Sequence, residues 1–531
     1  MNSVWVVGWL AAFSPVGTGT TAEEIIIIED GLLPYLPVTT TTADDSSVVV
    51  EDAPPAAVPS YFDITKARAN FRVDARFALD TSFERKGEQI AELWLGARLE
   101  LDLELSDRWA FYAAPRFDYV TGISREGDDR QLVYALFPEA QLTFRSGPFL
   151  VRAGSLLFTW GSSDLVSPID VLNPFDLRRN LLGFGQDTKI PVLAAEVVGN
   201  FGPLTVRGVV QPFFTASRYQ VTGWDFSVLQ TGGFPGADVL SNPELFNPAY
   251  LDRLGDEILV TDRPRDRPDN ATLAARATLS LGELELSVSA IHGWDTLPRL
   301  ILDQDLIFVA GAFGAAQAEG RPPPFDDSEV VGALGRLQRG VEDGRTLLRG
   351  SYLRRDLIGL DGSYALDPFV FKFDLAYTFK RTMYDWTYRP TTIGWLSSSL
   401  GVEYFYGDNL QVIVEGFVQT AVDIESNIRL LYLEANTPPP SPFIGGFRTV
   451  AVPGVVALVR YLFLDGDLAI DLALGSLLTR GDLALIPTIT WRVDDHHQLA
   501  LSGALLEGQS DSYGGFYTNT DQVSVSYRLS Y

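Results

Sequence analysis

The chain has 531 residues and a formal net charge of -27, from 41 basic and 68 acidic residues. Because nucleic-acid binding needs a net basic surface, this balance excludes nucleic acid as an expected partner. No run of about 20 uninterrupted apolar residues lies outside the extreme N-terminus, so no membrane-spanning helix is expected there. Cysteine is absent, which fits an envelope protein that needs no disulfide.

The N-terminal segment predicts export. Residues 1–22 resemble a secretory signal, with a short apolar core followed by small residues. Residues 23–60 are expected to be a flexible periplasmic tail. Within the tail, an apolar β-prone stretch resembles a TonB box, which pairs as an added strand with an energy-transducing partner; the alternative is an apolar patch without a partner. The stretch comprises Glu24, Ile25, Ile26, Ile27 and Ile28.

From about Lys66 onwards, polar and apolar residues alternate strictly in strand after strand. Arg72 and Asp74, for example, are separated by Val73 and flanked by Phe71 and Ala75. Successive side chains of a strand point to opposite faces, so one face is apolar and the other charged. No helical layer is visible that could cover the apolar face. The all-β pattern over residues 61–531 therefore predicts a transmembrane antiparallel β-barrel.

We predict about 18 strands, with 16 as the alternative. They span residues 61–81, 88–105, 108–123, 130–146, 148–160, 189–201, 203–216, 270–282, 283–294, 347–366, 368–384, 391–406, 409–424, 449–464, 467–480, 481–493, 496–507 and 521–531. Every second link is a tight turn, whereas the others include the long segments 161–188, 217–269, 295–346, 425–448 and 508–520. This asymmetry is typical of outer-membrane barrels of Gram-negative bacteria, with short periplasmic turns and long extracellular loops.

The ends of the barrel carry two partner predictions. The last strand alternates up to Tyr531, which resembles the C-terminal signal read by the barrel-assembly machinery. It should pair with the strand near Lys66 and close the barrel.

Acidic extracellular loops are expected to face lipopolysaccharide and could bind Ca²⁺ incidentally, while no other cofactor and no dedicated metal site is predicted. For the oligomeric state, a trimer and a monomer are both compatible with the sequence.

Charged residues on the inward phase near the closure point are the first candidate site. They could select ions or hold a sugar or carboxylate, or they could form an ion-paired ladder along a wet wall. The basic members are Arg72, Arg98, Arg116 and Arg528, and the acidic members are Asp74, Glu100, Asp102 and Asp118.

The fifth strand and the loop after it carry the clearest motif. It includes Arg152-Ala153-Gly154-Ser155, Trp160-Gly161-Ser162-Ser163-Asp164, the segment 170–179 and Lys189-Ile190-Pro191. This pattern resembles a proteobacterial outer-membrane family, domain-of-unknown-function family 1302, and more loosely alginate-export-type barrels. The resemblance covers residues 148–220 and implies a transport or export barrel without catalytic residues.

The same loop is predicted to fold into the barrel mouth and narrow it; the alternative is a compact extracellular loop. Asn173 and Pro174 are residue types typical of turns, and Asp176 could cap a short helix that carries two arginines. The residues of this candidate constriction are Asp170, Asn173, Asp176, Arg178 and Arg179. In the loop 295–346, apolar residues at helical spacing from Val330 to Val341 predict an amphipathic helix.

We expect the protein to be a porin-like channel that passes a small solute through a charged, loop-constricted lumen. Alternatives are energised uptake through the tail, a surface adhesin or structural barrel, and an outer-membrane hydrolase using His292. The sequence has only three histidines and no nucleophile–base arrangement around them, so no enzymatic activity is predicted.

Overall fold

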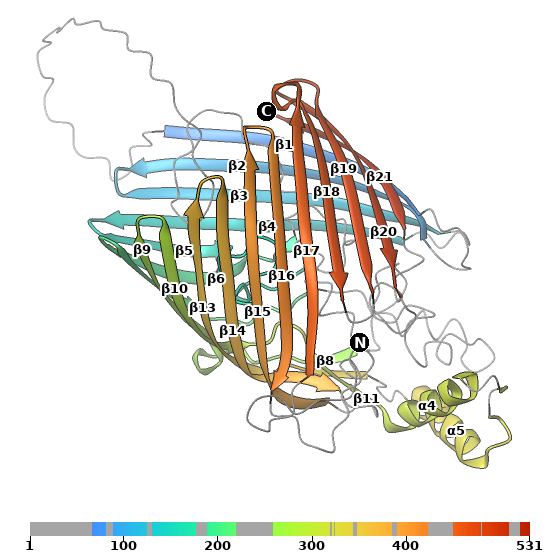
Figure 1. Ribbon diagram of the computed structural model, residues 1–531. Helices are drawn as coiled ribbons and strands as arrows, with labels where there is room; N and C mark the ends of the chain where they lie inside the picture. The colour runs from blue at the N-terminus through green and yellow to red at the C-terminus, as the bar shows by residue number, and fades with distance from the viewer. Residues whose placement is uncertain are drawn as a thin grey trace, which may run out of the picture.

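A computed structural model of the full chain describes the barrel and most of its links (Figure 1). The described residues are 66–80, 89–124, 130–176, 188–218, 259–318, 321–322, 324–343, 348–384, 390–422, 450–478, 481–508 and 521–531. The predicted signal and tail, 1–22 and 23–60, lie outside them.

Eighteen antiparallel strands form one sheet that closes on itself. In the order in which they follow one another around the barrel, they are β1 (Lys66–Asp80), β2 (Gln89–Ser106), β3 (Trp109–Ser124), β4 (Arg130–Ser146), β5 (Phe149–Leu156), β6 (Val192–Phe201), β7 (Leu204–Gln211), β9 (Thr272–Leu281), β10 (Leu284–Trp294), β13 (Arg354–Leu366), β14 (Phe369–Tyr384), β15 (Pro390–Tyr406), β16 (Leu410–Val422), β17 (Val450–Phe463), β18 (Leu468–Leu477), β19 (Leu483–Arg492), β20 (His497–Glu507) and β21 (Gln522–Ser530). The prediction of an antiparallel barrel with 18 strands is confirmed.

The first and last strands make the closing contact. In the antiparallel pairing of β1 with β21, Arg72 lies opposite Ser530 and Asp80 opposite Gln522. Phe71 and Tyr531 extend the ladder, since each backbone N–H donates to the carbonyl of the other, at 2.7 and 2.8 Å. Pairing of the two terminal strands leaves the sheet without a free edge, which removes the hazard of edge-to-edge association.

The outward face is apolar along the whole ring. Large hydrophobic side chains on alternate positions of the strands are exposed, among them Leu193, Val288, Leu400 and Val525. The residues between them point inward and are frequently charged, such as Glu196 on β6. An apolar outside with a polar inside is the arrangement of a barrel that spans a bilayer. Among the described residues, no helix is long and apolar enough to span one.

Two predicted strands end earlier than expected, and a third is divided in two. The fifth ends at Leu156, beyond which the chain packs against the inner wall, and the seventh ends at Gln211. The predicted strand 347–366 is two elements: β12 (Leu348–Ser351) belongs to a separate small sheet, and β13 begins at Arg354.

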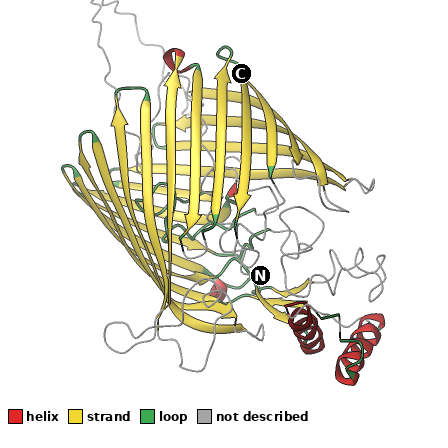
Figure 2. Cartoon of the chain, turned by 45° about the vertical axis from the view of Figure 1, so that its right-hand side comes forward, coloured by secondary structure: helices red, strands yellow, loops and turns green. Residues whose placement is uncertain are grey.

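The long-loop end of the barrel carries a small sheet and two helices (Figure 2). β8 (Leu259–Asp262) pairs in parallel with β12, and β11 (Arg299–Leu302) pairs antiparallel with it. The predicted amphipathic helix is confirmed as α5 (Ser328–Glu342). It packs on α4 (Gln304–Ala318), a helix that the sequence analysis did not predict.

Candidate functional site

The described part of the link between β5 and β6 begins with a segment, residues 157–176, that lies inside the barrel; we call it the inner loop. Its apolar side chains pack on inward residues of the wall from β6 to β14. The loop and the end of β5 contribute Leu156, Phe158, Trp160, Ile169 and Leu172, and the wall contributes Val192, Ala194, Val209, Ala274, Ile291, Leu357 and Ala376. This apolar cluster attaches the loop to one half of the inner wall by excluding water between them.

The loop turns at Gly161, where φ is +106°. A side chain at this position would place its Cβ 1.9 Å from Ser167 Oγ and 2.5 Å from Asp374 Oδ2. Only glycine adopts such a backbone conformation and leaves this space empty. The turn brings the next residues onto the wall of β13–β16.

Carboxylates of the wall bind the backbone of the loop at this turn. Asp374 on β14 accepts N–H hydrogen bonds from Ser162 at 2.8 Å and Ser163 at 3.2 Å. The Ser162 hydroxyl donates to Asp361 on β13 at 2.9 Å. Asp361 also accepts from Arg276 of β9 at 2.6 Å, so its charge is compensated.

Glu415 on β16 makes the most extensive contact with the loop. Its Oε1 accepts the backbone N–H groups of Asp164 at 2.6 Å and Leu165 at 3.1 Å, and its Oε2 accepts that of Val166 at 2.8 Å. Glu415 is fully buried. Hydrogen bonds to a charged acceptor are stronger than neutral ones, so three of them at one side chain fix the loop tip firmly.

Lys372 on β14 supplies a positive charge beside these acids. Its Nζ lies 2.5 Å from Asp164 Oδ2 of the loop and 2.9 Å from Glu403 Oε2 of β15. Gln411 donates a further hydrogen bond to Glu403 at 2.6 Å. One ammonium group therefore bridges the loop tip and the wall.

The returning half of the loop contains the residues predicted to form a constriction. Asn173 is buried and bonds the backbone of both flanking segments: its Oδ1 accepts from Phe158 N, and its Nδ2 donates to the carbonyls of Leu156 and Ile190. Asp170 forms an ion pair with Lys189.

Asp176 does not lie at a helix start among the described residues. It forms an isolated bridge with Arg218, whose guanidinium is 3.9 Å from its carboxylate. Arg178, Arg179 and the helix predicted there lie outside the described residues, as do Glu24, Ile25, Ile26, Ile27 and Ile28 of the tail.

The inward charged residues near the closure point form ion pairs along the wall. We call this group the arginine ladder. Its pairs are Arg72–Asp74 at 2.8 Å, Arg528–Asp74 at 2.7 Å, Arg98–Glu100 at 2.8 Å, Arg98–Glu139 at 3.1 Å and Arg116–Asp118 at 3.0 Å. Asp102 lies on β2 opposite Arg68 of β1. Each of the four arginines of this group lies within ion-pair distance of an acid on the same or a neighbouring strand.

The arginine ladder and the attachment of the inner loop lie on opposite walls. Around the ring, eight strands separate β2 from β14 in either direction. Figure 1 shows β1–β4 crossing behind the wall that contains β13–β17. The inner loop and the arginine ladder therefore lie on opposite sides of the barrel interior.

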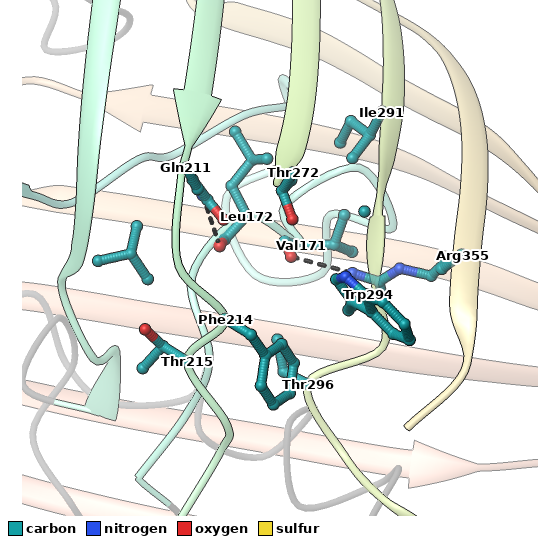
Figure 3. A pocket seen from close by; sticks show the side chains of 12 residues that line it. Val171, Leu172, Gln211, Phe214, Thr215, Thr272, Ile291, Trp294, Thr296 and Arg355 are labelled. Carbon is teal, nitrogen blue, oxygen red and sulfur yellow. Dashed lines mark hydrogen bonds between the residues drawn. The ribbon is translucent and has the colours of Figure 1, made fainter. Parts of the chain in front are cut away.

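A small pocket, open to solvent, lies beside the returning half of the loop (Figure 3). Val171 and Leu172 form one side of it, and Ile291 and Trp294 belong to the opposing wall. Arg355 on β13 donates to the carbonyl of Val171 at 3.0 Å. Beyond the end of β10, Asp295 is buried, and burial raises its pKa, partly offset by nearby Arg355.

The histidines lie away from the inner loop. His292 and Asp356 form an exposed pair, with Nδ1 2.5 Å from Oδ1. His496 and His497 lie at the short turn between β19 and β20, stacked on Tyr531 and Tyr527. Within the described part of the chain, no group of three or more His, Cys, Asp or Glu residues could hold a metal ion.

The carboxylates and the lysine that hold the inner loop were missed by the sequence analysis. Asp361, Asp374, Glu403 and Glu415 share one signal: each is an isolated acid on the inward phase of a strand. That signal does not say which loop the acids bind, because residues about 200 or more positions apart in the sequence meet here.

Comparison with known proteins gives no family. No family model and no curated protein matches the sequence. Among solved structures, OmpF of Salmonella typhi in complex with daunomycin matches with a TM-score of 0.38 at 9% identity, over 88% of this chain and 97% of that chain. A loop L8 deletion mutant of OmpT from Vibrio cholerae matches at 0.35 and 8%, over 88% and 100%.

A mutant porin of Rh. blastica matches with a TM-score of 0.33 at 11% identity, again over 88% of this chain and 100% of that chain. At these scores the assignment as a barrel rests on the strand pairing of the chain itself. The resemblance to domain-of-unknown-function family 1302 stays a prediction.

Proposed function

We propose that the protein is an outer-membrane channel that passes a small solute through a lumen narrowed by the inner loop. The observation that carries the proposal is the attachment of the loop tip to Asp374 and Glu415, opposite the arginine ladder. Barrels of 16–18 strands are wide enough to leave an aqueous channel. A loop fixed along one wall would reduce this width.

The charge arrangement supports a channel for polar solutes. The ladder presents guanidinium and carboxylate groups side by side, and such groups replace part of the hydration shell of a solute. Because the pairs neutralise one another, we expect weak rather than strict selection between cations and anions. The short turns would then face the periplasm and the long loops the exterior.

The experiment is a planar-bilayer recording of the full-length protein with a salt gradient across the membrane. We expect a steady single-channel conductance and a reversal potential close to zero. Folded protein that inserts into the bilayer and carries no current would contradict the proposal. Insertion is checked independently by the heat-dependent gel mobility of folded barrels.

A further inference from the structure

The two carboxyl oxygens of Asp374 differ in their hydrogen bonds. Asp374 lies on the inner wall at the turn of the inner loop and is buried. Its Oδ1 accepts the backbone N–H groups of Ser162 and Ser163, at 2.8 and 3.2 Å. Its Oδ2 is also buried but, among the described residues, receives no hydrogen bond. A buried acceptor without a donor costs free energy, so an ionised Asp374 is poorly satisfied here.

The group beside this oxygen is the hydroxyl of Ser167. A Cβ added at Gly161 would lie 1.9 Å from Ser167 Oγ and 2.5 Å from Asp374 Oδ2, so both oxygens border the same point. The hydroxyl donates its only proton to the carbonyl of Trp160 at 3.0 Å, and its oxygen accepts the N–H of Ile169 at 3.3 Å. Because a hydroxyl oxygen has two lone pairs, one of them is available for a further donor. Turning the hydroxyl towards Asp374 would only move the missing donor to Trp160.

One additional proton on Asp374 Oδ2 satisfies both acceptors at once. A neutral carboxyl group is a donor at one oxygen and an acceptor at the other. It would donate to Ser167 Oγ, while Oδ1 keeps its two backbone hydrogen bonds. Since Oδ2 is buried, a proton is a partner that needs no additional space, whereas a water molecule or a metal ion would need it.

The charges around Asp374 also favour its neutral form. Asp361 lies directly opposite it in the pairing of β13 with β14, and like charges in this position repel each other. The charged groups of the neighbouring elements are engaged with other partners. They are Arg276 with Asp361, Lys372 with Asp164 and Glu403, and Glu415 with the backbone of the loop. Within the described part of the chain, no cation is therefore left to pair with Asp374.

We propose that Asp374 carries a proton when the inner loop is attached, and that loss of this proton at higher pH loosens the turn from Ser162 to Ser167. The loop tip then depends on Glu415 and Lys372. In the proposed channel, the attachment of the loop and the steadiness of the current become dependent on pH. This consequence rests on the proposed function, whereas the proton on Asp374 requires no current.

The test compares the parent protein with Asp374→Asn, whose amide reproduces the neutral acid because it accepts at Oδ1 and donates to Ser167 from Nδ2. Full-length protein in an ester-free detergent is unfolded with urea between about pH 4 and about pH 8. If the folded parent binds one more proton than the unfolded chain, its folding equilibrium constant relative to the variant should fall about ten-fold or more over this range. Infrared spectroscopy should show a C=O band of a protonated carboxyl group that Asp374→Asn lacks.

Asp471→Asn is the matched control. Asp471 is also buried on the inner wall, but both of its oxygens accept from Arg460, at 2.6 and 3.3 Å. No such fall is expected for this pair of proteins, because an ion-paired carboxylate stabilises the folded state at and above the ordinary titration range of Asp. The carboxyl band should be the same in the parent and in Asp471→Asn.

Three results would overturn the inference. They are an Asp374→Asn protein that fails to fold, a parent whose stability relative to it is constant or increases with pH, and an unchanged carboxyl band. In bilayer recordings, the current noise of the parent should increase with pH and that of Asp374→Asn should not; equal noise would overturn the coupling of the proton to the loop. A silent recording would instead refute the channel and leave the urea and infrared results unchanged.

Discussion

Glu415 and Val166 are joined across the inside of the barrel although 249 positions separate them in the sequence, because the backbone N–H of Val166 donates to Glu415 Oε2 at 2.8 Å. The same carboxylate accepts from Asp164 and Leu165. Three consecutive N–H groups thus point at one acid. This contact determines where the tip of the inner loop lies.

Replacing Glu415 by Gln should loosen the loop tip. The amide retains one acceptor oxygen and places an NH₂ group against backbone N–H donors, so the free energy of unfolding should fall by about 2 kcal/mol. Urea unfolding in detergent measures the loss, and current noise in the bilayer should increase. Glu283→Gln, in an exposed short turn, is the control and should change neither. An unaltered E415Q protein would show that the contact does not hold the loop.

Replacing Lys372 alone should lower the free energy of unfolding more than replacing Lys372 and Glu403 together. Lys372→Met leaves Glu403 and Asp164 without their shared cation, and breaking a buried pair typically destabilises by about 3–5 kcal/mol. Adding Glu403→Gln should restore part of the loss, since one uncompensated charge disappears. Urea unfolding of both single variants and the double variant gives the coupling energy. Lys380→Met on the exposed part of β14 serves as control, and strictly additive effects would argue against the bridge.

Gly161→Ala tests the turn at which the loop meets the wall. A left-handed conformation alone costs an alanine about 1–2 kcal/mol. At Gly161 the added Cβ would also lie 1.9 Å from Ser167 Oγ, so a larger loss is expected. Gly407→Ala is the matched control, because Gly407 has φ +55° and no heavy atom within 4 Å of its Cβ position. Equal losses in the two variants would contradict the described packing.

Asp494 predicts a pH-dependent contribution at the short turn between β19 and β20. The backbone N–H groups of His496 and His497 donate to its carboxylate, both at 2.8 Å, and the first of them is the main reason that its pKa is lowered. A carboxyl group with a lowered pKa in the folded state stabilises it at neutral pH, and this contribution disappears as the pH falls through that pKa.

The parent protein should therefore be thermally more stable than Asp494→Asn at neutral pH, and the difference should shrink as the pH falls below 3.8, the ordinary value for Asp. Because the group is exposed, the difference is small. A stability difference that increases as the pH falls below the ordinary value for Asp would contradict this account.

The strand count and the closure of the barrel could be predicted because alternation is a local signal. Every strand from Lys66 to Tyr531 carries its own apolar and polar faces, and the turns mark its ends. The arginine ladder was also visible, since its members lie on neighbouring strands near the two ends of the chain. The helix α5 was recognised from its spacing, whereas α4 was missed because it is apolar on all sides and shows no periodicity.

The attachment of the inner loop could not be predicted from local patterns. The motif around Trp160 and Asn173 marked the loop as unusual, but its partners Asp374 and Glu415 lie on strands more than 200 residues away. Acids on the inward phase of those strands are typical of any water-lined barrel wall, so they do not identify the partners of the loop. Only the closed ring brings them to the loop, so the position of the loop is a property of the tertiary structure.

The most direct test of the central claim is the single-channel conductance of a variant with a shortened inner loop. Ser167 Oγ donates to the carbonyl of Trp160 at 3.0 Å, so the two limbs of the loop lie close together, and residues 162–168 can be replaced by two glycines between Gly161 and Ile169. If the inner loop narrows a solute path, the variant should conduct at least two-fold more than the full-length protein at the same salt concentration. An identical conductance in folded, inserted protein would contradict the account.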